Sequence, residues 1–253
     1  MENDIVTLNS VLNSKVFVHE KSQISFGSPR QLIEPFLEKL VNSKVEFTVK
    51  VSERVANKEA GTDIVNEAFG RVLVEAKFPS EYSIKEHDHV IGMVYSLDTQ
   101  KPSMRIYSGE NAWACTNLAI FGAKYIHNVE IMQGTGSIYD KGMEFIEGIT
   151  EQLSRFQLLY EKMNDTQYEG EQINTLMGYL LREGYRNKSL GINPILSAVK
   201  DLDDNKSKYA IRENKTSQWN VYSALTQYVT DKVSILDKAD KTVMLSNLFV
   251  KDL

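Results

Sequence analysis

Cysteine is almost absent from this sequence, since one residue, Cys115, occurs among 253. A single cysteine cannot form a disulfide within the chain, so the covalent cross-links that stabilise many small secreted domains are excluded. We therefore expect a protein whose fold is stabilised by a hydrophobic core and which resides in a reducing cytoplasm.

Long hydrophobic runs are also missing. No segment approaches the roughly 18 apolar residues that a membrane-spanning helix requires. The acidic start from Met1 to Asp4 is not followed by a hydrophobic segment of signal-peptide length. We expect no membrane span, no export signal and no membrane partner.

Charge of one sign does not dominate either. The chain carries 34 acidic and 29 basic side chains, a net charge of −5. This balance argues against a surface devoted entirely to polyanions, although a local group of basic residues can still bind them.

Apolar residues make up 42% of the chain, enough to bury a substantial core. In the first half they alternate with polar residues, which is the pattern of strands with one buried face. We expect strands at 45–52, 71–78, 90–97, 104–107 and 127–132. Together they predict an antiparallel sheet of four to five strands, in which the first two pair with each other.

One helix start is visible in the first half. Ser28 is a typical N-cap, Pro29 suits the first helical position, and Gln31 follows the cap by three residues. Pro35 removes a backbone donor inside the helix, which costs about 3 kcal/mol. We therefore expect the first turn to be a separate 3₁₀ piece.

The second half shows apolar residues at helical spacing. The longest pattern predicts one long amphipathic helix at 138–164. Further helices are expected at 170–182, at 193–202 with Asn193 as N-cap, from Thr216 or Ser217 to about 229, and at 243–249.

The order of these elements predicts an α+β fold, strand-rich over 44–133 and helical over 138–253. We expect an N-terminal arm at 1–27 and a single domain at 28–253, because no repeat or flexible linker interrupts it. The polar segment 203–215 is the nearest candidate for a boundary.

Two stretches carry a resemblance to a known family. The first is Cys115-Thr116-Asn117, and the second is the aromatic stretch with Trp219, Tyr222 and Tyr228. With the segment 89–97, they resemble phage and plasmid-like proteins that are known as domain of unknown function nine hundred and thirty-two. The likeness spans about 85–230 and departs from the family pattern at Ala114 and Leu118. It implies a mobile-element origin and life in a host cytoplasm, but no reaction.

Cys115 is the one candidate nucleophile of the cysteine type. Such a nucleophile needs a base and an oxyanion site, and the spacing of the sequence identifies neither. A buried, inert cysteine is the simpler interpretation. We expect Thr116 and Asn117 to satisfy backbone groups where a strand ends.

Two further patterns are candidates for small ligands. His87 and His89 lie on one face if they belong to a strand, and His127 or Glu86 would have to converge on them to complete a metal site. The stretch 134–136 could bind an anion at a helix N-terminus, but a Gly-x-Gly is a common turn. We expect no catalytic residue and no cofactor.

Basic and aromatic residues are interleaved twice in the second half. Cations that contact phosphates, together with rings on which bases stack, are what single-strand binding requires. The alternative is a pair of solvated loops, because nearby acids dilute the charge. The candidate binding residues are Arg182, Tyr185, Arg186, Lys188, Lys206, Lys208, Tyr209, Arg212 and Lys215. We expect Trp219, Tyr222 and Tyr228 to be core residues instead.

The family resemblance, which implies a mobile-element origin, and the two basic segments together favour a non-enzymatic phage or plasmid protein of nucleic-acid metabolism. We expect it to bind single-stranded DNA, to form a homo-oligomer, and to work in annealing or recombination, because the order of its elements is similar to that of single-strand annealing proteins. One alternative is a structural protein that assembles with itself or with virion or host partners through a sheet edge or a long helix. Another is a metal-dependent enzyme that uses His87 and His89.

Overall fold

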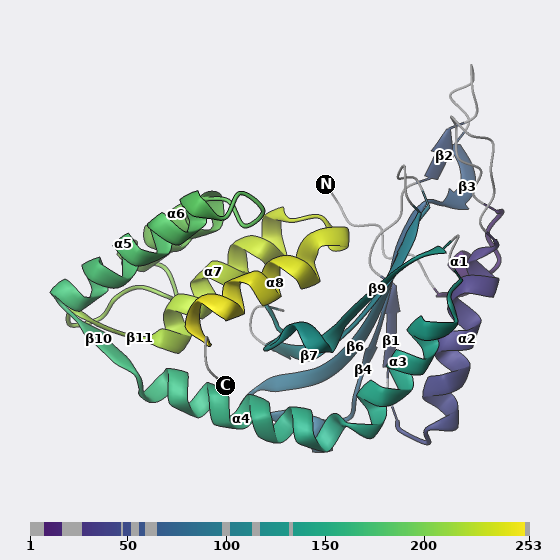
Figure 1. The fold of residues 1–253 in the computed structure, drawn as a ribbon, viewed down its shortest axis with the longest axis horizontal. Coiled ribbons are helices and arrows are strands. Elements are labelled where there is room, and N and C mark those ends of the chain that lie inside the picture. The colour runs from purple at the N-terminus through teal and green to yellow at the C-terminus, as the bar shows by residue number, and fades with distance from the viewer. Residues whose placement is uncertain are drawn as a thin grey trace. The chain divides into compact units, whose positions relative to one another are not determined.

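The structure, a computed structural model, describes residues 8–16, 27–46, 48–51, 56–58, 65–97, 102–112, 117–131 and 134–250. The fold is α+β, as the sequence predicts, with a seven-stranded sheet early in the chain and helices in the second half (Figure 1). The chain divides into two compact units, each made of three segments. Unit 1 contains Met1–Ser83, Asp88–Ser108 and Lys124–Thr150, and unit 2 contains Ile84–His87, Gly109–Ala123 and Glu151–Leu253.

The main sheet follows the order β1-β4-β6-β7-β8, with β5 beside β6 and β9 beside β7. Its strands are β1 (Thr48–Val51), β4 (Arg71–Lys77), β5 (Ser83–Ile84), β6 (His87–Ser96), β7 (Ser103–Ala112), β8 (Leu118–Ala119) and β9 (Ile126–Glu130). The first two predicted strands pair antiparallel, with Val49 opposite Ala76. The sheet exceeds the expected four to five strands because β5 and β8 have only two residues each, too few to show a period in the sequence.

Two small hairpins lie outside this sheet. One pairs β2 (Ala56–Lys58) with β3 (Val65–Phe69), and the other pairs β10 (Gln167–Glu169) with β11 (Lys215–Ser217). Two short 3₁₀ turns, Ser80–Tyr82 and Ala123–Tyr125, complete the irregular parts.

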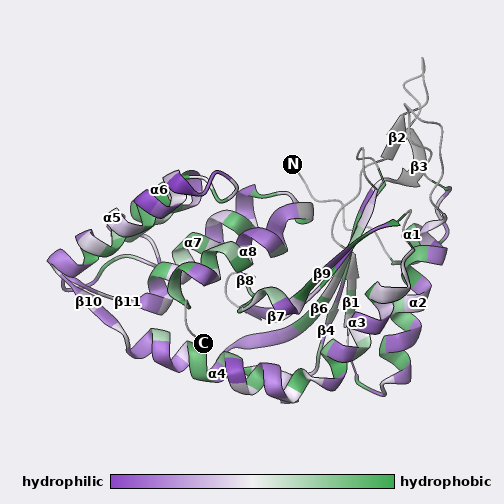
Figure 2. Ribbon diagram, in the orientation of Figure 1, coloured by the Kyte–Doolittle hydropathy of each residue, from purple (hydrophilic) through white to green (hydrophobic). Residues whose placement is uncertain are grey.

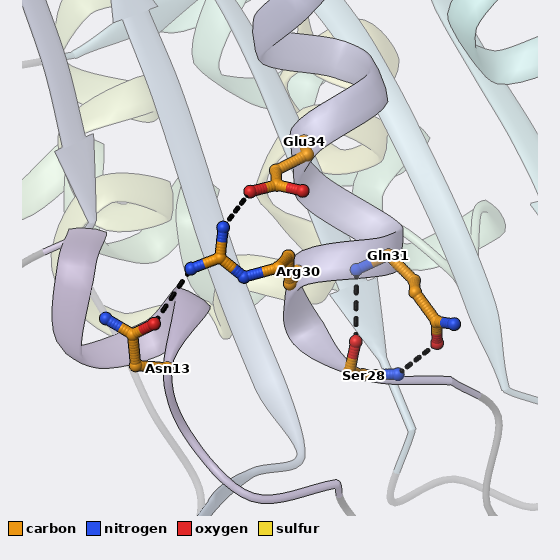
Figure 3. A network of polar contacts seen from close by, with 5 residues as sticks. All are labelled: Asn13, Ser28, Arg30, Gln31 and Glu34. Atoms are coloured by element: carbon orange, nitrogen blue, oxygen red, sulfur yellow. Dashed lines mark hydrogen bonds and ion pairs between the residues drawn. The ribbon is translucent and has the colours of Figure 1, made fainter.

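Unit 1 contains α1 (Leu8–Leu12), α2 (Pro29–Asn42) and α3 (Gly136–Glu147). The predicted cap of α2 is confirmed: Ser28 Oγ accepts from the Gln31 N–H over 3.2 Å, and Gln31 Oε1 accepts from the Ser28 N–H over 2.8 Å (Figure 3). The helix continues through Pro35, so the expected separate 3₁₀ turn is wrong. Burial of Ile33 and Phe36 on either side offsets the missing backbone bond.

The N-terminal arm includes one anchored helix. Val11 of α1 is fully buried, and Arg30 of α2 donates to Asn13 Oδ1 over 2.8 Å while it pairs with Glu34 (Figure 3). The start of the arm and the segment 17–26 lie outside the described residues.

Tyr107 crosses the sheet of unit 1. A Cβ on Gly92 would lie 2.1 Å from the Tyr107 ring, so only glycine leaves room for the ring over β6. The hydroxyl then donates to Glu75 Oε2 of β4 over 2.9 Å. Burial, followed by the nearby Glu75 carboxylate, holds the pKa of Tyr107 well above its ordinary value.

Most of unit 2 consists of helices. These are α4 (Ile149–Asp165), whose first two residues belong to unit 1, α5 (Glu171–Arg186), α6 (Asn193–Asp203), α7 (Gln218–Lys232) and α8 (Ile235–Phe249). Figure 2 shows hydrophilic and hydrophobic residues mixed along α5 and α6, as in amphipathic helices. The core gathers on α7, where Val221, Tyr222 and Leu225 are buried.

Three helix predictions need correction. The single helix expected at 138–164 is two helices, α3 and α4, because Gly148, the C-cap of the first, leaves the helical conformation with a ψ of 7°. Asn193 lies inside α6, so Ile192 stands at its cap. The last helix starts at Ile235 and not near 243, whereas the predicted Ser217 cap of α7 is confirmed.

Two other predictions concern the stretches 134–136 and 203–215. The stretch 134–136 leads directly into α3, whose first residue is Gly136: Gly134 has a φ of 99°, and Thr135, at the N-cap, makes no side-chain capping bond. The boundary suggested at 203–215 lies inside unit 2.

Candidate functional site

Aromatic rings from the start of β6, from α4 and from α7 surround Trp219 in unit 2. The indole lies 4.8 Å from the ring of Tyr160 and 5.3 Å from the imidazole of His87, and its angle to both is steep. Tyr222, one helical turn later on α7, lies 5.4 Å away. Edge-to-face pairs of this kind add about 0.5–1.5 kcal/mol each beyond burial, so the position of Trp219 is well determined.

A pocket opens beside this aromatic group, entirely within unit 2. It contains about 760 Å³ of space between and beside protein atoms, part of it open to solvent. The β5–β6 turn, the β7–β8 hairpin, α4, the loop before β11 and α7 all contribute to its wall. The lining residues are Lys85, Glu86, His87, Ala112, Asn117, Leu118, Ala119, Tyr160, Lys208, Tyr209, Trp219, Asn220, Tyr222, Ser223 and Thr226.

The β5–β6 turn brings charge to the pocket in a strained conformation. Lys85 and Glu86 have φ values of 50° and 65°, a left-handed pair that favours glycine or asparagine. Both side chains are exposed. The turn thus places an ammonium group and a carboxylate at the rim, at a conformational cost of about 1–2 kcal/mol per residue.

His87 begins β6 directly after this turn, and 6% of its surface is exposed. Its Nδ1 lies 2.7 Å from the Lys85 carbonyl oxygen. A carbonyl oxygen only accepts, so Nδ1 carries a proton and the imidazole is held in one orientation.

Two of the predicted metal ligands, His89 and the third-ligand candidate His127, lie against serine side chains. The Nε2 atom of His89 lies 3.1 Å from Ser108 Oγ, and that of His127 lies 3.2 Å from Ser137 Oγ. Across the described ranges, no three side chains among His, Cys, Asp and Glu form a cluster that could hold a metal ion. The described residues thus bring no third ligand to His87 and His89.

Asn117 connects its own stretch to α7, the helix that contains Trp219, Tyr222 and Tyr228. Its Nδ2 donates to the Ser223 carbonyl oxygen over 2.9 Å and to the Tyr209 hydroxyl over 3.1 Å, and its Oδ1 accepts from Thr230 Oγ1 over 3.2 Å. It satisfies a backbone group, as predicted, but on α7 and not at its own strand end. Cys115 and Thr116 lie outside the described residues.

The three aromatic residues of α7 singled out from the sequence, Trp219, Tyr222 and Tyr228, differ in burial. Tyr222 is 1% exposed, and its hydroxyl lies 3.0 Å from Ser246 Oγ of α8, so it is a core residue as expected. Trp219 and Tyr228 are only partly buried. The indole of Trp219 therefore reaches the pocket while it packs against the core.

The first basic segment is an open surface at the end of α5. The ring of Tyr185 is 80% exposed, and Arg182, Arg186 and Lys188 are exposed around it. Arg186 pairs with Glu183 over 3.3 Å. Arg182 and Lys188 form no ion pair with any residue that the structure describes. We call these four residues the Tyr185 surface.

The second basic segment is arranged differently. Lys206, Lys208, Arg212 and Lys215 are exposed, and Lys215 pairs with Glu169 over 2.9 Å. Tyr209 is only 6% exposed, so its ring cannot serve as the stacking platform that the sequence suggested. Its hydroxyl accepts from Asn117 and donates to Gln227 Oε1, and its ring lies under the Lys208 ammonium, 4.9 Å from the ring centre.

Sequence reasoning missed Lys85, Tyr160 and Asn220 as pocket residues. Tyr160 has the spacing of an ordinary helix residue, and Asn220 sits in the first turn of a predicted helix. The only local signal of the β5–β6 turn was the polar pair Lys85-Glu86 before His87. This pair contains no glycine, so the sequence did not mark it as a turn. Their convergence depends on contacts between distant segments.

Comparison of the chain with models of known protein families, with curated proteins and with solved structures finds no match. Among the helices that the structure describes, none combines the length and the apolar character needed to cross a bilayer.

Proposed function

We propose that this protein binds single-stranded DNA, as a non-enzymatic phage or plasmid protein of nucleic-acid metabolism in a host cytoplasm. The observation that carries the proposal is the exposed ring of Tyr185, 80% accessible, amid Arg182, Arg186 and Lys188. A ring that packs so little of its surface contributes little to the core. It is available to stack on a base, while the cations contact the phosphates on either side.

The charges of the Tyr185 surface suit a single strand. Among the residues that the structure describes, only Glu183 opposes its three cations through an ion pair, and exposed ion pairs are weak enough for a phosphate to replace. Stacking tolerates any base, since every base has a π face. The proposal is therefore binding without sequence preference, and it places the contact in unit 2 alone.

The alternative function, assembly with itself or with another protein, also has an observation in its favour. Ile192 and Leu196, at the start of α6, are 37% and 50% exposed. Exposed apolar side chains mark contact surfaces when they lie together. A stable oligomer that is indifferent to DNA would favour this second function.

Fluorescence anisotropy of a labelled single-stranded oligonucleotide, titrated with the protein at low and moderate salt, tests the first proposal. We expect binding that weakens steeply with salt, because phosphate contacts release counterions. No binding at low salt would overturn the proposal. Assembly with itself or with another protein would then be the favoured function, to be tested by mass measurement in solution.

The triple change of Arg182, Arg186 and Lys188 to Gln locates the site. It should reduce the magnitude of the slope of log affinity against log salt by about 2, since each phosphate contact to a single strand contributes about 0.7 to that slope. The charge-matched control changes Lys162, Lys200 and Lys232, which are exposed lysines of unit 2, to Gln. Equal effects of the two triple changes would refute the placement at the Tyr185 surface.

A further inference from the structure

The pocket of unit 2 combines groups that the Tyr185 surface lacks. Its wall holds two rings, Tyr160 and Trp219, beside the amide of Asn220 and the ammonium groups of Lys85 and Lys208. Rings that stack, amides that read the edge of a base, and cations that pair with phosphate are how proteins hold nucleotides. We propose that this pocket binds one nucleotide, by its base and its phosphate together.

The two rings are the part of the wall that a planar ligand can reach. Tyr209 and Tyr222 also line the pocket, but both are buried, whereas Tyr160 and Trp219 are partly exposed. The rings of His87 and Phe156 contact the indole edge-to-face, with ring centres 5.3 and 5.9 Å away. A base that enters therefore meets rings that are already fixed, and it orders few side chains on binding.

Asn220 supplies a directional contact. Its Nδ2 donates to the Tyr209 carbonyl oxygen over 2.8 Å and to Thr216 Oγ1 over 2.9 Å. A carbonyl oxygen only accepts, so these bonds determine which way the amide is turned. Within the described part of the chain nothing donates to Oδ1, which remains an acceptor for an amino group of a base such as adenine or cytosine.

The charges around the pocket favour an anion. Lys85 and Lys208 face a single acid among the lining residues, Glu86. Both lysines are exposed at the rim and form no ion pair with a residue in the described ranges. A phosphate at the rim would pair with them, with the base directed inward to the rings.

The nucleotide could be a free mononucleotide or one member of a bound strand, since both present the same base and phosphate. The pocket does not include any residue of the Tyr185 surface. Binding at the pocket and binding of DNA at that surface are thus separate claims, and either can fail alone.

Tryptophan fluorescence of the full-length chain tests the pocket. The chain has two tryptophans, so Trp113→Phe leaves Trp219 as the only one. We expect saturable quenching by deoxyadenosine 5′-monophosphate, with weaker binding of deoxyadenosine and of deoxyribose 5-phosphate, because each contains only part of the recognised chemistry. Calorimetric titration of the unchanged chain gives the same comparison without any substitution.

Variants that remove one lysine charge each test the contribution of Lys85 and Lys208 to phosphate binding. Lys208→Gln and Lys85→Gln should each weaken the monophosphate about tenfold, the effect of losing one charge-assisted contact, and leave deoxyadenosine unchanged. Lys206→Gln is the control, because this exposed lysine lies two residues away and does not line the pocket. Absence of saturable binding of the monophosphate, or an equal loss with Lys206→Gln, would overturn the proposal.

Competition separates the two sources of the nucleotide. If the monophosphate displaces a labelled single-stranded oligonucleotide, the pocket takes a nucleotide of the strand. If both bind together, it takes a free mononucleotide. A chain that binds the oligonucleotide but not the monophosphate disproves only the pocket assignment, and the reverse result disproves only the proposed function.

Discussion

Asn117 Nδ2 lies 2.9 Å from the carbonyl oxygen of Ser223, a residue 106 positions later in the chain. This bond and the one to Thr230 attach the start of β8 to α7, and the bond to Tyr209 attaches it to the loop before β11. The Ser223 bond also brings together the Cys115-Thr116-Asn117 stretch and the stretch that contains Trp219 and Tyr222. Both stretches contribute to the wall of the pocket.

Asn117→Asp should destabilise the protein by about 2–3 kcal/mol, because it replaces a buried donor with an acceptor opposite the Ser223 carbonyl oxygen. Urea unfolding measures this as a lower transition midpoint with an unchanged slope. Asn247→Asp, at an exposed position of α8, is the control and should stay within about 0.5 kcal/mol of the parent. Similar midpoints for the two variants would show that the Asn117 bonds contribute little.

Two tyrosines of unit 1 should respond in opposite ways to the loss of a hydroxyl. The Tyr95 hydroxyl is buried and has no hydrogen-bond partner among the described residues, whereas that of Tyr107 donates to Glu75. Tyr95→Phe should leave stability unchanged or raise it by up to about 1 kcal/mol, and Tyr107→Phe should lower it by about 1–3 kcal/mol. Urea unfolding of both variants decides, and a loss at Tyr95 equal to that at Tyr107 would contradict this account.

Stability should fall at alkaline pH. Burial raises the pKa of Tyr95, Tyr107 and Tyr222 well above the ordinary value. Above about pH 10 the unfolded chain loses these phenolic protons while the folded chain keeps them, so the unfolded state binds fewer protons and stability declines with pH. Each group contributes a slope of up to about 1.4 kcal/mol per pH unit.

Urea unfolding from pH 8 to 11 measures that slope. Tyr95→Phe removes one of the three buried groups and should make the decline shallower. A slope that does not change in this variant would mean that the Tyr95 hydroxyl ionises as readily in the folded chain as in the unfolded one.

Two glycines of α5 provide a matched pair. A Cβ on Gly184 would lie 2.3 Å from Ile195 Cδ1 and 2.8 Å from the Gly191 carbonyl oxygen, whereas one on Gly178 would meet nothing within 4 Å. Gly184→Ala should therefore destabilise unit 2 by about 1–3 kcal/mol through overpacking. Gly178→Ala should stabilise it by about 1 kcal/mol through helix propensity. Thermal unfolding of both variants checks the sign, and stabilisation by Gly184→Ala would show that α5 and α6 are less tightly packed than described.

Tyr185→Ala should weaken binding of a single-stranded oligonucleotide by about 1–3 kcal/mol, the usual value of one stacked base. Tyr185→Phe keeps the ring and should bind like the parent. Because the side chain is exposed, neither change should alter the unfolding midpoint by more than about 0.5 kcal/mol. Equal binding by the alanine and phenylalanine variants would exclude stacking at this ring.

Local signals in the sequence predicted the elements that depend on neighbouring residues. The alternation at 71–78 is β4, and Ser28 and Ser217 are the caps that they were expected to be. Each of these features depends on side chains within a few positions, so the α+β class could be predicted without knowledge of the fold.

The misplaced elements depend on context that a short window lacks. Gly148 lies within an uninterrupted apolar pattern, so the sequence did not reveal that α3 ends there. In the structure α3 belongs to unit 1 and most of α4 to unit 2. The strands β5 and β8 exist because longer neighbours pair with them, since two residues have no period of their own.

Tyr185 and Tyr209 show where the sequence stops being informative. Each stands among basic residues in the second half, and the sequence offers no reason to treat them differently. In the structure Tyr185 is exposed, while Tyr209 is buried and bonded to Asn117, a residue of a distant hairpin. The sequence by itself determined the classes of the elements, because periodicity and capping are local. Only the tertiary structure decided which rings are accessible and which residues form the pocket, because burial depends on contacts between segments far apart in the chain.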